Sequence, residues 1–192
     1  MRFRTTAGLW FTLAFAVLLL PLPWIAALTL SSLFHEFCHL VAAKLTGVPV
    51  LELQIGAGGA YLKIGDMTPF QEFVCALAGP LGALLLLLSA RWMPRTAICA
   101  AIQSAYHLLP LYPLDGGKAL HSLTTFFGFP PVLHQIVEYA VMFGLVLIGL
   151  SLLRVGFGFL PLIGVIAILF RVFREKYLAK RSGTGYNRDT SI

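Results

Sequence analysis

Residues 33–45 read LFHEFCHLVAAKL and place two histidines and a glutamate inside an apolar run. His35 and His39 are four residues apart, so on a helix their rings project from one face. Glu36 lies beside the first histidine. This H-E-x-x-H spacing lets two imidazoles bind one zinc ion while the glutamate reaches a bound water. The alternative is a set of buried polar residues with ordinary partners, but polar groups inside an apolar span cost several kcal/mol. The pattern therefore favours a metal.

A catalytic zinc needs a third protein ligand and an open position. The candidate is Asp115, in the segment YHLLPLYPLDGGKAL. Pro110 and Pro113 break the preceding helix, and Gly116 and Gly117 free the backbone to turn the carboxylate inward. Alone, LDGG is an ordinary turn, so the assignment depends on the H-E-x-x-H motif.

The composition predicts a membrane protein. The chain has 192 residues, of which 58% are hydrophobic and 11% charged, and its mean hydropathy is +0.86. Soluble domains carry about 25% charged residues. A nucleic-acid binder, which the pI near 9.5 would suggest, is excluded because the basic residues collect at loops and tails, as the positive-inside rule expects. The three cysteines lie in apolar segments without C-x-x-C spacing and read as small buried hydrophobes; they are Cys38, Cys75 and Cys99.

About six apolar segments are long enough, or nearly so, to be transmembrane helices. The third has a clear start, since Thr68 can cap it, Pro69 suits the first helical position and Gln71 completes a capping box. Residues 115–128 are too short and polar to span and predict a short interfacial or buried helix. The six expected spans are about 7–20, 24–45, 69–90, 96–112, 131–153 and 155–172.

Residues 48–66 alternate apolar and polar side chains around a glycine-rich turn, which predicts a short β-hairpin between the second and third spans. The fold class is therefore an all-α polytopic membrane protein with one membrane-associated hairpin. We expect a single domain over residues 1–192, with a catalytic core at about 24–118 and a polar tail at about 174–192. Six spans place both termini on one side, and the bias of basic residues makes that side cytoplasmic.

These motifs resemble the site-2 protease family of intramembrane zinc metalloproteases (M50-type), and the small size resembles its sporulation-factor branch. The likeness covers about residues 24–118. The family's H-E-x-x-H falls on His35, Glu36 and His39, and its A-G-P motif on residues 78–80. Its N-x-x-P-x-x-x-L-D-G pattern falls on residues 107–116, with His107 in place of the asparagine.

The resemblance implies that His35, His39 and Asp115 hold one Zn²⁺ per chain and that Glu36 is the catalytic base. It implies that the hairpin, through Leu53, Gln54, Ile55 and Gly56, guides the substrate. That substrate would be a membrane-tethered protein, cut in or near its transmembrane segment in the lipid bilayer of a bacterial cell membrane. No segment is long enough for a PDZ or nucleotide-binding module, so regulatory membrane proteins could be needed as partners.

Several roles stay open at this stage. His107 could be an oxyanion or substrate hydrogen-bond donor, an extra ligand or a core histidine. Gly79 and Gly82 could let the third span approach the zinc helix or could serve packing alone. Three other residues, His121, His134 and Glu138, are more often interfacial or bundle-facing than ligands. The rival functions are an inactive homologue that binds membrane clients as a scaffold, and a transporter or channel.

Overall fold

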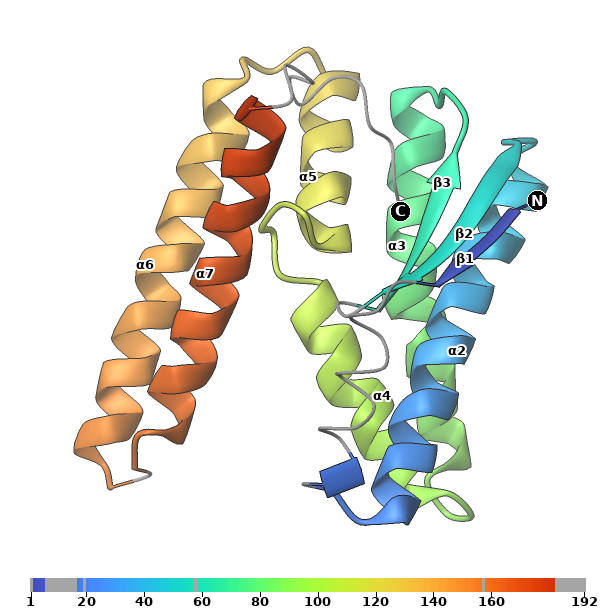
Figure 1. Cartoon of the computed structure of the whole chain (residues 1–192). Helices are drawn as coiled ribbons and strands as arrows, with labels where there is room; N and C mark the ends of the chain where they lie inside the picture. The colour runs from blue at the N-terminus through green and yellow to red at the C-terminus, as the bar shows by residue number, and fades with distance from the viewer. Residues whose placement is uncertain (1, 6–16, 19, 57–58, 157, 182–192) are drawn as a thin grey trace. The chain divides into compact units, whose positions relative to one another are not determined.

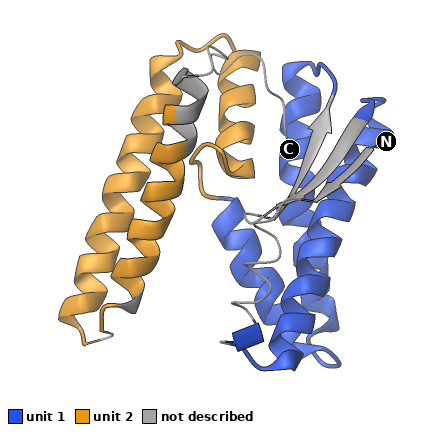
Figure 2. Cartoon of the chain, viewed as in Figure 1, with its two compact units in different colours: residues 1–108, 190–192 blue, residues 109–189 orange. Residues whose placement is uncertain are grey.

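The computed structural model describes the backbone of residues 2–5, 17–18, 20–56, 59–156 and 158–181 (Figure 1). Contacts between residues divide this part of the chain into two compact units (Figure 2). The first contains the described residues up to Leu108, and the second those from Leu109 to Arg181.

Three helices form the body of the first unit: α2 (Leu22–Leu45), α3 (Pro69–Ala83), which continues as the 3-10 helix η1 (Leu84–Ser89), and α4 (Pro94–His107). α2 packs against both α3 and α4. The buried residues of α2 recur every three or four positions, which is the spacing of a single helix face. They are Ala27, Ser31, His35, His39, Ala42 and Ala43. The histidines of the motif therefore lie on the packed face of this helix.

The start of α3 is the capping box that the sequence predicts. The Gln71 N–H donates to Thr68 Oγ1 over 3.3 Å, and the Thr68 N–H donates to Gln71 Oε1 over 2.9 Å. The Gln71 side-chain amide also donates to the Thr46 carbonyl oxygen over 3.0 Å. Because Thr46 caps the end of α2, this bond ties the first turn of α3 to the last turn of α2.

A three-stranded sheet accompanies these helices, with the order β1 (Arg2–Thr5), β2 (Val50–Gly56) and β3 (Gly59–Ile64). β2 and β3 are antiparallel and occupy the segment for which the alternating pattern predicts a hairpin. The parallel strand β1 is not predicted. The expected two-stranded hairpin is thus part of a larger sheet, and β2 is its central strand, with Leu53, Gln54 and Ile55 paired on both sides.

The second unit contains α5 (Asp115–Phe126), α6 (Val132–Arg154) and α7 (Leu160–Arg181). α5 and α7 each pack against α6. The short helix expected at 115–128 is therefore present as α5.

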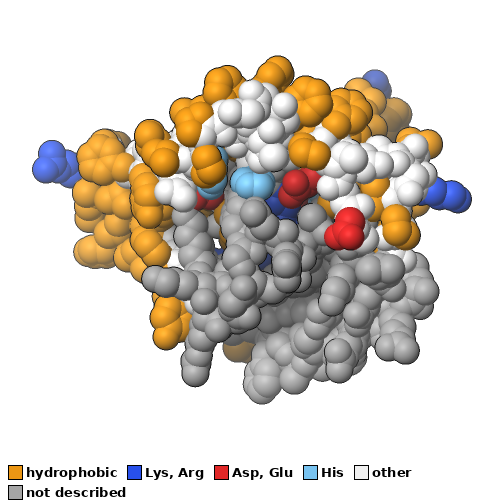
Figure 3. Space-filling model, turned by 90° about the horizontal axis from the view of Figure 1, so that it is seen from above, with side chains coloured by type: hydrophobic (Ala, Val, Ile, Leu, Met, Phe, Trp, Pro, Cys, Tyr) orange, Lys and Arg blue, Asp and Glu red, His pale blue; other side chains and the backbone are white. Residues whose placement is uncertain are grey.

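Three helices among the described residues are long and apolar enough to cross a membrane: Leu22–Leu45, Pro69–Ser89 and Val132–Arg154. They match the spans expected at about 24–45, 69–90 and 131–153. Large apolar side chains on these helices are exposed, including Leu33, Phe37 and Phe143, and hydrophobic side chains cover much of the described surface in Figure 3. Such surface needs an apolar solvent, which identifies a membrane protein.

The other three expected spans differ from the structure or lie beyond it. The range 7–20 falls largely outside the described residues. α4 ends at His107 rather than at 112, because Pro110 lacks an N–H and disfavours helical backbone in the residue before it. α7 begins at Leu160 rather than at 155, after Gly156 and Gly158 adopt φ values of 94° and 74°. α7 also continues to Arg181, through the first part of the expected polar tail; residues 182–192 are outside the described part.

Candidate metal centre

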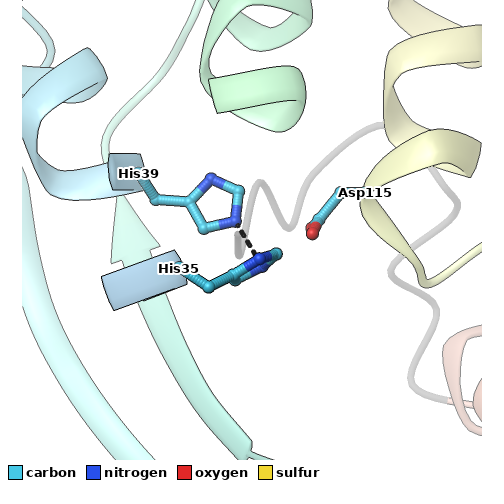
Figure 4. A group of neighbouring side chains, drawn as sticks. All are labelled: His35, His39 and Asp115. Atoms are coloured by element: carbon cyan, nitrogen blue, oxygen red, sulfur yellow. Dashed lines mark hydrogen bonds between the residues drawn. The ribbon is translucent and has the colours of Figure 1, made fainter. Parts of the chain in front are cut away.

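His35 and His39 face each other on consecutive turns of α2. Their side chains are 0% and 1% exposed, and their Nε2 atoms are 3.1 Å apart (Figure 4). The ring planes are nearly perpendicular, at 82°, with centroids 4.8 Å apart. The two nitrogens therefore lie within hydrogen-bond distance of each other, close enough for a single ion to contact both.

The His39 ring is oriented by α3. Its Nδ1 lies 2.7 Å from the carbonyl oxygen of Cys75. A carbonyl only accepts, so Nδ1 carries the proton and donates, which leaves the lone pair on Nε2 in the neutral ring. A backbone carbonyl that fixes the tautomer in this way is the usual support of a metal-binding histidine.

Gly79 makes room for that ring. A Cβ atom on Gly79 would lie 2.7 Å from Cδ2 of His39 and closer still to its Nε2. One turn along α3, a Cβ on Gly82 would lie 2.7 Å from Cβ of Cys38 and closer to its sulfur. The two glycines thus let α3 approach the motif helix α2 closely. At Gly79 the same close approach also determines where the His39 ring can lie.

The histidine pair fits a zinc ion. Two nitrogens at Zn–N distances of about 2.0–2.1 Å and a tetrahedral angle lie roughly 3.3 Å apart. The separation of 3.1 Å needs only a small adjustment to reach that value. Glu36, the next residue of α2, is half-buried with its Oε2 shielded from solvent. A carboxyl group with little access to bulk water, on the same helix as the two histidines, is suited to exchanging a proton with a bound water.

His107, the last residue of α4, lies against the histidine pair. Its ring centroid is 4.4 Å from that of His35, with the planes tilted by 58°. One turn before these two histidines, the Ser31 hydroxyl donates to Oε1 of Gln103 over 2.9 Å. The sequence analysis did not single out Ser31 or Gln103. The sequence nevertheless contains a signal for them: each is a polar residue four positions before a histidine on the same helix face, Ser31 before His35 and Gln103 before His107.

Asp115 belongs to the second unit and is the first residue of α5 (Figure 4). Its side chain is 5% exposed. The N-terminus of a helix favours a negative charge, so α5 stabilises the ionised carboxylate. Gly117 packs its α-carbon against the peptide bond between Leu111 and Tyr112, since a Cβ there would lie 2.6 Å from the Leu111 oxygen. The second glycine of LDGG thus serves close packing.

The remaining polar residues of interest also lie in the second unit. The rings of His121 and His134 are 5.2 Å apart. Burial, and next the proximity of His134, lower the pKa of His121 to about 4, while Glu138 acts in the opposite direction. His121 is therefore neutral at pH 7. The hairpin residues 53–56 have a defined backbone in β2, and their side chains lie outside the described part of the structure.

Comparison with known proteins gives three findings. A family model described as Peptidase M50B-like matches residues 9–174. A Synechocystis sp. protein named "Putative zinc metalloprotease sll0528" is 31% identical over 123 residues, which is 53% of this chain and 32% of that protein. This chain thus spans about a third of that relative's length. The Site-2 Protease from Methanocaldococcus jannaschii has a similar fold, with a TM-score of 0.62 and 16% identity over 90% of this chain and 89% of that one.

Proposed function

The chain belongs to the Peptidase M50B-like family, and we propose that it is an intramembrane zinc metalloendopeptidase. It would hydrolyse a peptide bond in or near the transmembrane segment of a membrane-tethered protein. The observation that carries the proposal is the pair of Nε2 atoms of two buried histidines 3.1 Å apart, on a helix that also carries Glu36 and is long and apolar enough to span a membrane. Metal ligands and a base at that position have no role in a purely structural span.

His35, His39 and Asp115 are the proposed ligands of one zinc ion per chain. Two imidazoles and one carboxylate form a normal catalytic zinc set, which leaves one position open. Asp115 comes eight residues after His107, whose ring lies against His35, so the chain itself limits how far the carboxylate can be from the histidines. We propose a single metalloprotease domain over residues 1–192.

A zinc ion in this site would polarise the scissile carbonyl and lower the pKa of water towards 7. Glu36 would accept the proton of the attacking water and deliver it to the leaving amine. His107 would use one ring N–H to donate to the developing oxyanion or to the substrate backbone. Burial of the histidine pair keeps bulk water away and strengthens these interactions.

The substrate must present an extended backbone, because the carbonyls of an intact helix are already hydrogen-bonded. We propose that the β2–β3 hairpin, including residues 53–56, guides it by strand addition. In the described sheet β2 is the central strand, so residues 53–56 would support an edge strand, β1 or β3, to which the substrate adds. We also propose that regulatory membrane proteins act as partners.

We further propose that the protein crosses a bacterial cell membrane several times, with about six spans and both termini in the cytoplasm. Basic residues support this orientation. They are Arg2 and Arg4 at the N-terminus, Lys44 in the last turn of α2, Lys63 in β3, Lys118, and the basic residues from Arg171 onward, which the positive-inside rule would place on the cytoplasmic side.

The experiment is cleavage of a single-span test substrate by the purified full chain in detergent or vesicles, with zinc measured by mass spectrometry. The wild type should contain one zinc per chain and cleave. Glu36→Gln should keep its zinc and lose cleavage, because the amide cannot accept the proton while both imidazoles remain. Cleavage by Glu36→Gln at the wild-type rate would refute the role of Glu36.

The same assay separates the rival functions. Zinc without cleavage of any membrane-tethered substrate would indicate an inactive scaffold protein. Absence of zinc in the wild type, together with metal-ion or proton flux across vesicles, would indicate a transporter or channel.

A further inference from the structure

Glu138 is a carboxyl group buried within α6, a helix long and apolar enough to cross a membrane. Its side chain is only 3% exposed. Acidic residues at such places are expensive and usually have a specific partner. Here the partner is the backbone N–H of Tyr112, which donates to Oε1 of Glu138 over 2.8 Å.

Tyr112 lies in the segment that joins α4 to α5 and so leads directly to Asp115. We propose that Glu138 is a positioning residue that fixes this segment and, through it, the Asp115 carboxylate. The inference rests on the proposed function, because it takes Asp115 as a zinc ligand.

The segment and the first turn of α5 form one packed body. The Leu114 N–H donates to the Leu111 oxygen over 2.8 Å, and the Lys118 N–H donates to the Leu114 oxygen over 3.1 Å. Leu111 is fully buried, and Gly117 packs against the Leu111–Tyr112 peptide bond. A hydrogen bond that fixes the position of the Tyr112 N–H therefore also fixes the start of α5, where Asp115 lies.

A side-chain oxygen suits this task. The Tyr112 N–H is outside any helix, so it needs an acceptor from elsewhere in an apolar surrounding. The carbonyls of a continuous helix such as α6 are already used by its own ladder, so the acceptor that α6 offers is the side-chain oxygen of Glu138. Pro113, the next residue, has no N–H. The Tyr112 N–H that Glu138 accepts from is therefore the last backbone donor before Leu114.

A second metal site is the competing explanation, because His134 lies one turn before Glu138 and its ring contacts that of His121. Within the described residues these three side chains do not gather at the spacing of metal ligands.

The test compares the zinc affinity of full-length variants by competition with a chelator. Glu138→Leu removes the acceptor and should weaken zinc binding by on the order of 10- to 100-fold, the range for residues that orient metal ligands. Glu138→Gln retains an oxygen that accepts the same bond and should bind zinc within about threefold of the wild type. Gln135→Leu, a polar-to-apolar change at an exposed site on the same helix, is the matched control and should have no effect.

Glu138→Asp covers the case in which the leucine variant does not fold. It keeps the charge but draws the carboxylate back by one methylene, so it should also lose the bond and weaken zinc binding. Wild-type zinc affinity in Glu138→Asp or in a folded Glu138→Leu would overturn the inference, even if the melting temperature falls, because only stability would then depend on Glu138. Strong binding by Glu138→Asp with weak binding by Glu138→Gln would overturn it as well, since charge rather than the hydrogen bond would matter. A wild type without zinc would overturn the proposed function, and this inference with it.

Discussion

Gly79→Ala is the sharpest perturbation of the histidine pair, because it adds one methyl group beside the proposed ligand His39 without removing any polar atom. The new Cβ would lie 2.7 Å from Cδ2 of His39 and closer to its Nε2. Ordinary contacts between such atoms begin at about 3.5 Å. The imidazole would therefore have to shift by roughly 1 Å, or α3 would have to move away from α2 by a similar distance.

Neither movement is tolerated easily. The His39 ring is held at Nδ1 by the Cys75 carbonyl over 2.7 Å, and this bond would lengthen or break. Zinc–ligand distances vary by only about 0.2 Å in functional sites, and a misplacement of about 1 Å can reduce a rate about 100-fold. We expect Gly79→Ala to weaken zinc binding by on the order of 10- to 100-fold and to reduce cleavage by at least about 100-fold.

Zinc affinity is measured by chelator competition, cleavage with a single-span substrate, and folding by circular dichroism. Gly144→Ala is the matched control. Gly144 also lies within an apolar helix, α6, and a Cβ there meets nothing within 4 Å, so this variant should behave like the wild type. If Gly79→Ala binds zinc as tightly as Gly144→Ala and cleaves at the same rate, the close packing of Gly79 on His39 does not matter and the reasoning is refuted.

Three further predictions concern single side chains. Asp115→Ala should weaken zinc binding by at least about 100-fold and abolish cleavage; zinc retained at one per chain would show that the third ligand lies elsewhere. His107→Leu should keep zinc and lose about 100-fold in rate, the effect of one oxyanion donor, whereas His107→Asn should stay active; zinc loss in His107→Leu would make His107 a ligand, and full activity would make it a packing residue. His121 has its pKa lowered from 6.5 to about 4, so between these pH values the unfolded chain binds more protons than the folded one. The contribution of neutral His121 to folding stability should therefore be fully present above pH 6.5 and should decrease as the pH falls towards about 4. The melting temperature of His121→Asn should fall less over this range. Equal dependence of the melting temperature on pH in the two proteins would contradict the prediction.

The sequence predicted those parts of the structure that depend on local spacing. The interval of four between His35 and His39 places both rings on one helix face whatever surrounds the helix, and the structure confirms that face as buried. The capping box at Thr68 and Gln71 is equally local and is confirmed. Three of the expected spans agree with the structure to within two residues at each end.

The features that were wrong or missed depend either on pairing between distant residues or on backbone effects that hydropathy does not register. The four residues of β1 are too few for their alternation to identify a strand, and their pairing with β2 makes them one. The end of α4 at His107 and the late start of α7 reflect proline and glycine effects on the backbone just beyond each helix, which hydropathy does not register. The bond between Glu138 and the Tyr112 N–H joins positions 26 residues apart, and no spacing rule reveals such a pair.

Three buried polar groups on the apolar helices nevertheless indicate how the helices pack, because each of the three is hydrogen-bonded to a group on another element. His39 donates to the Cys75 carbonyl of α3, Ser31 donates to Gln103 of α4, and Glu138 accepts from the Tyr112 backbone. In each case a polar group on one element is satisfied by a group from another element, as the cost of an unsatisfied group in an apolar medium requires. A polar residue within a predicted span therefore indicates which helix face must meet a neighbour. Ser31 is four positions from the proposed ligand His35, and its bond to Gln103 joins that face of α2 to α4.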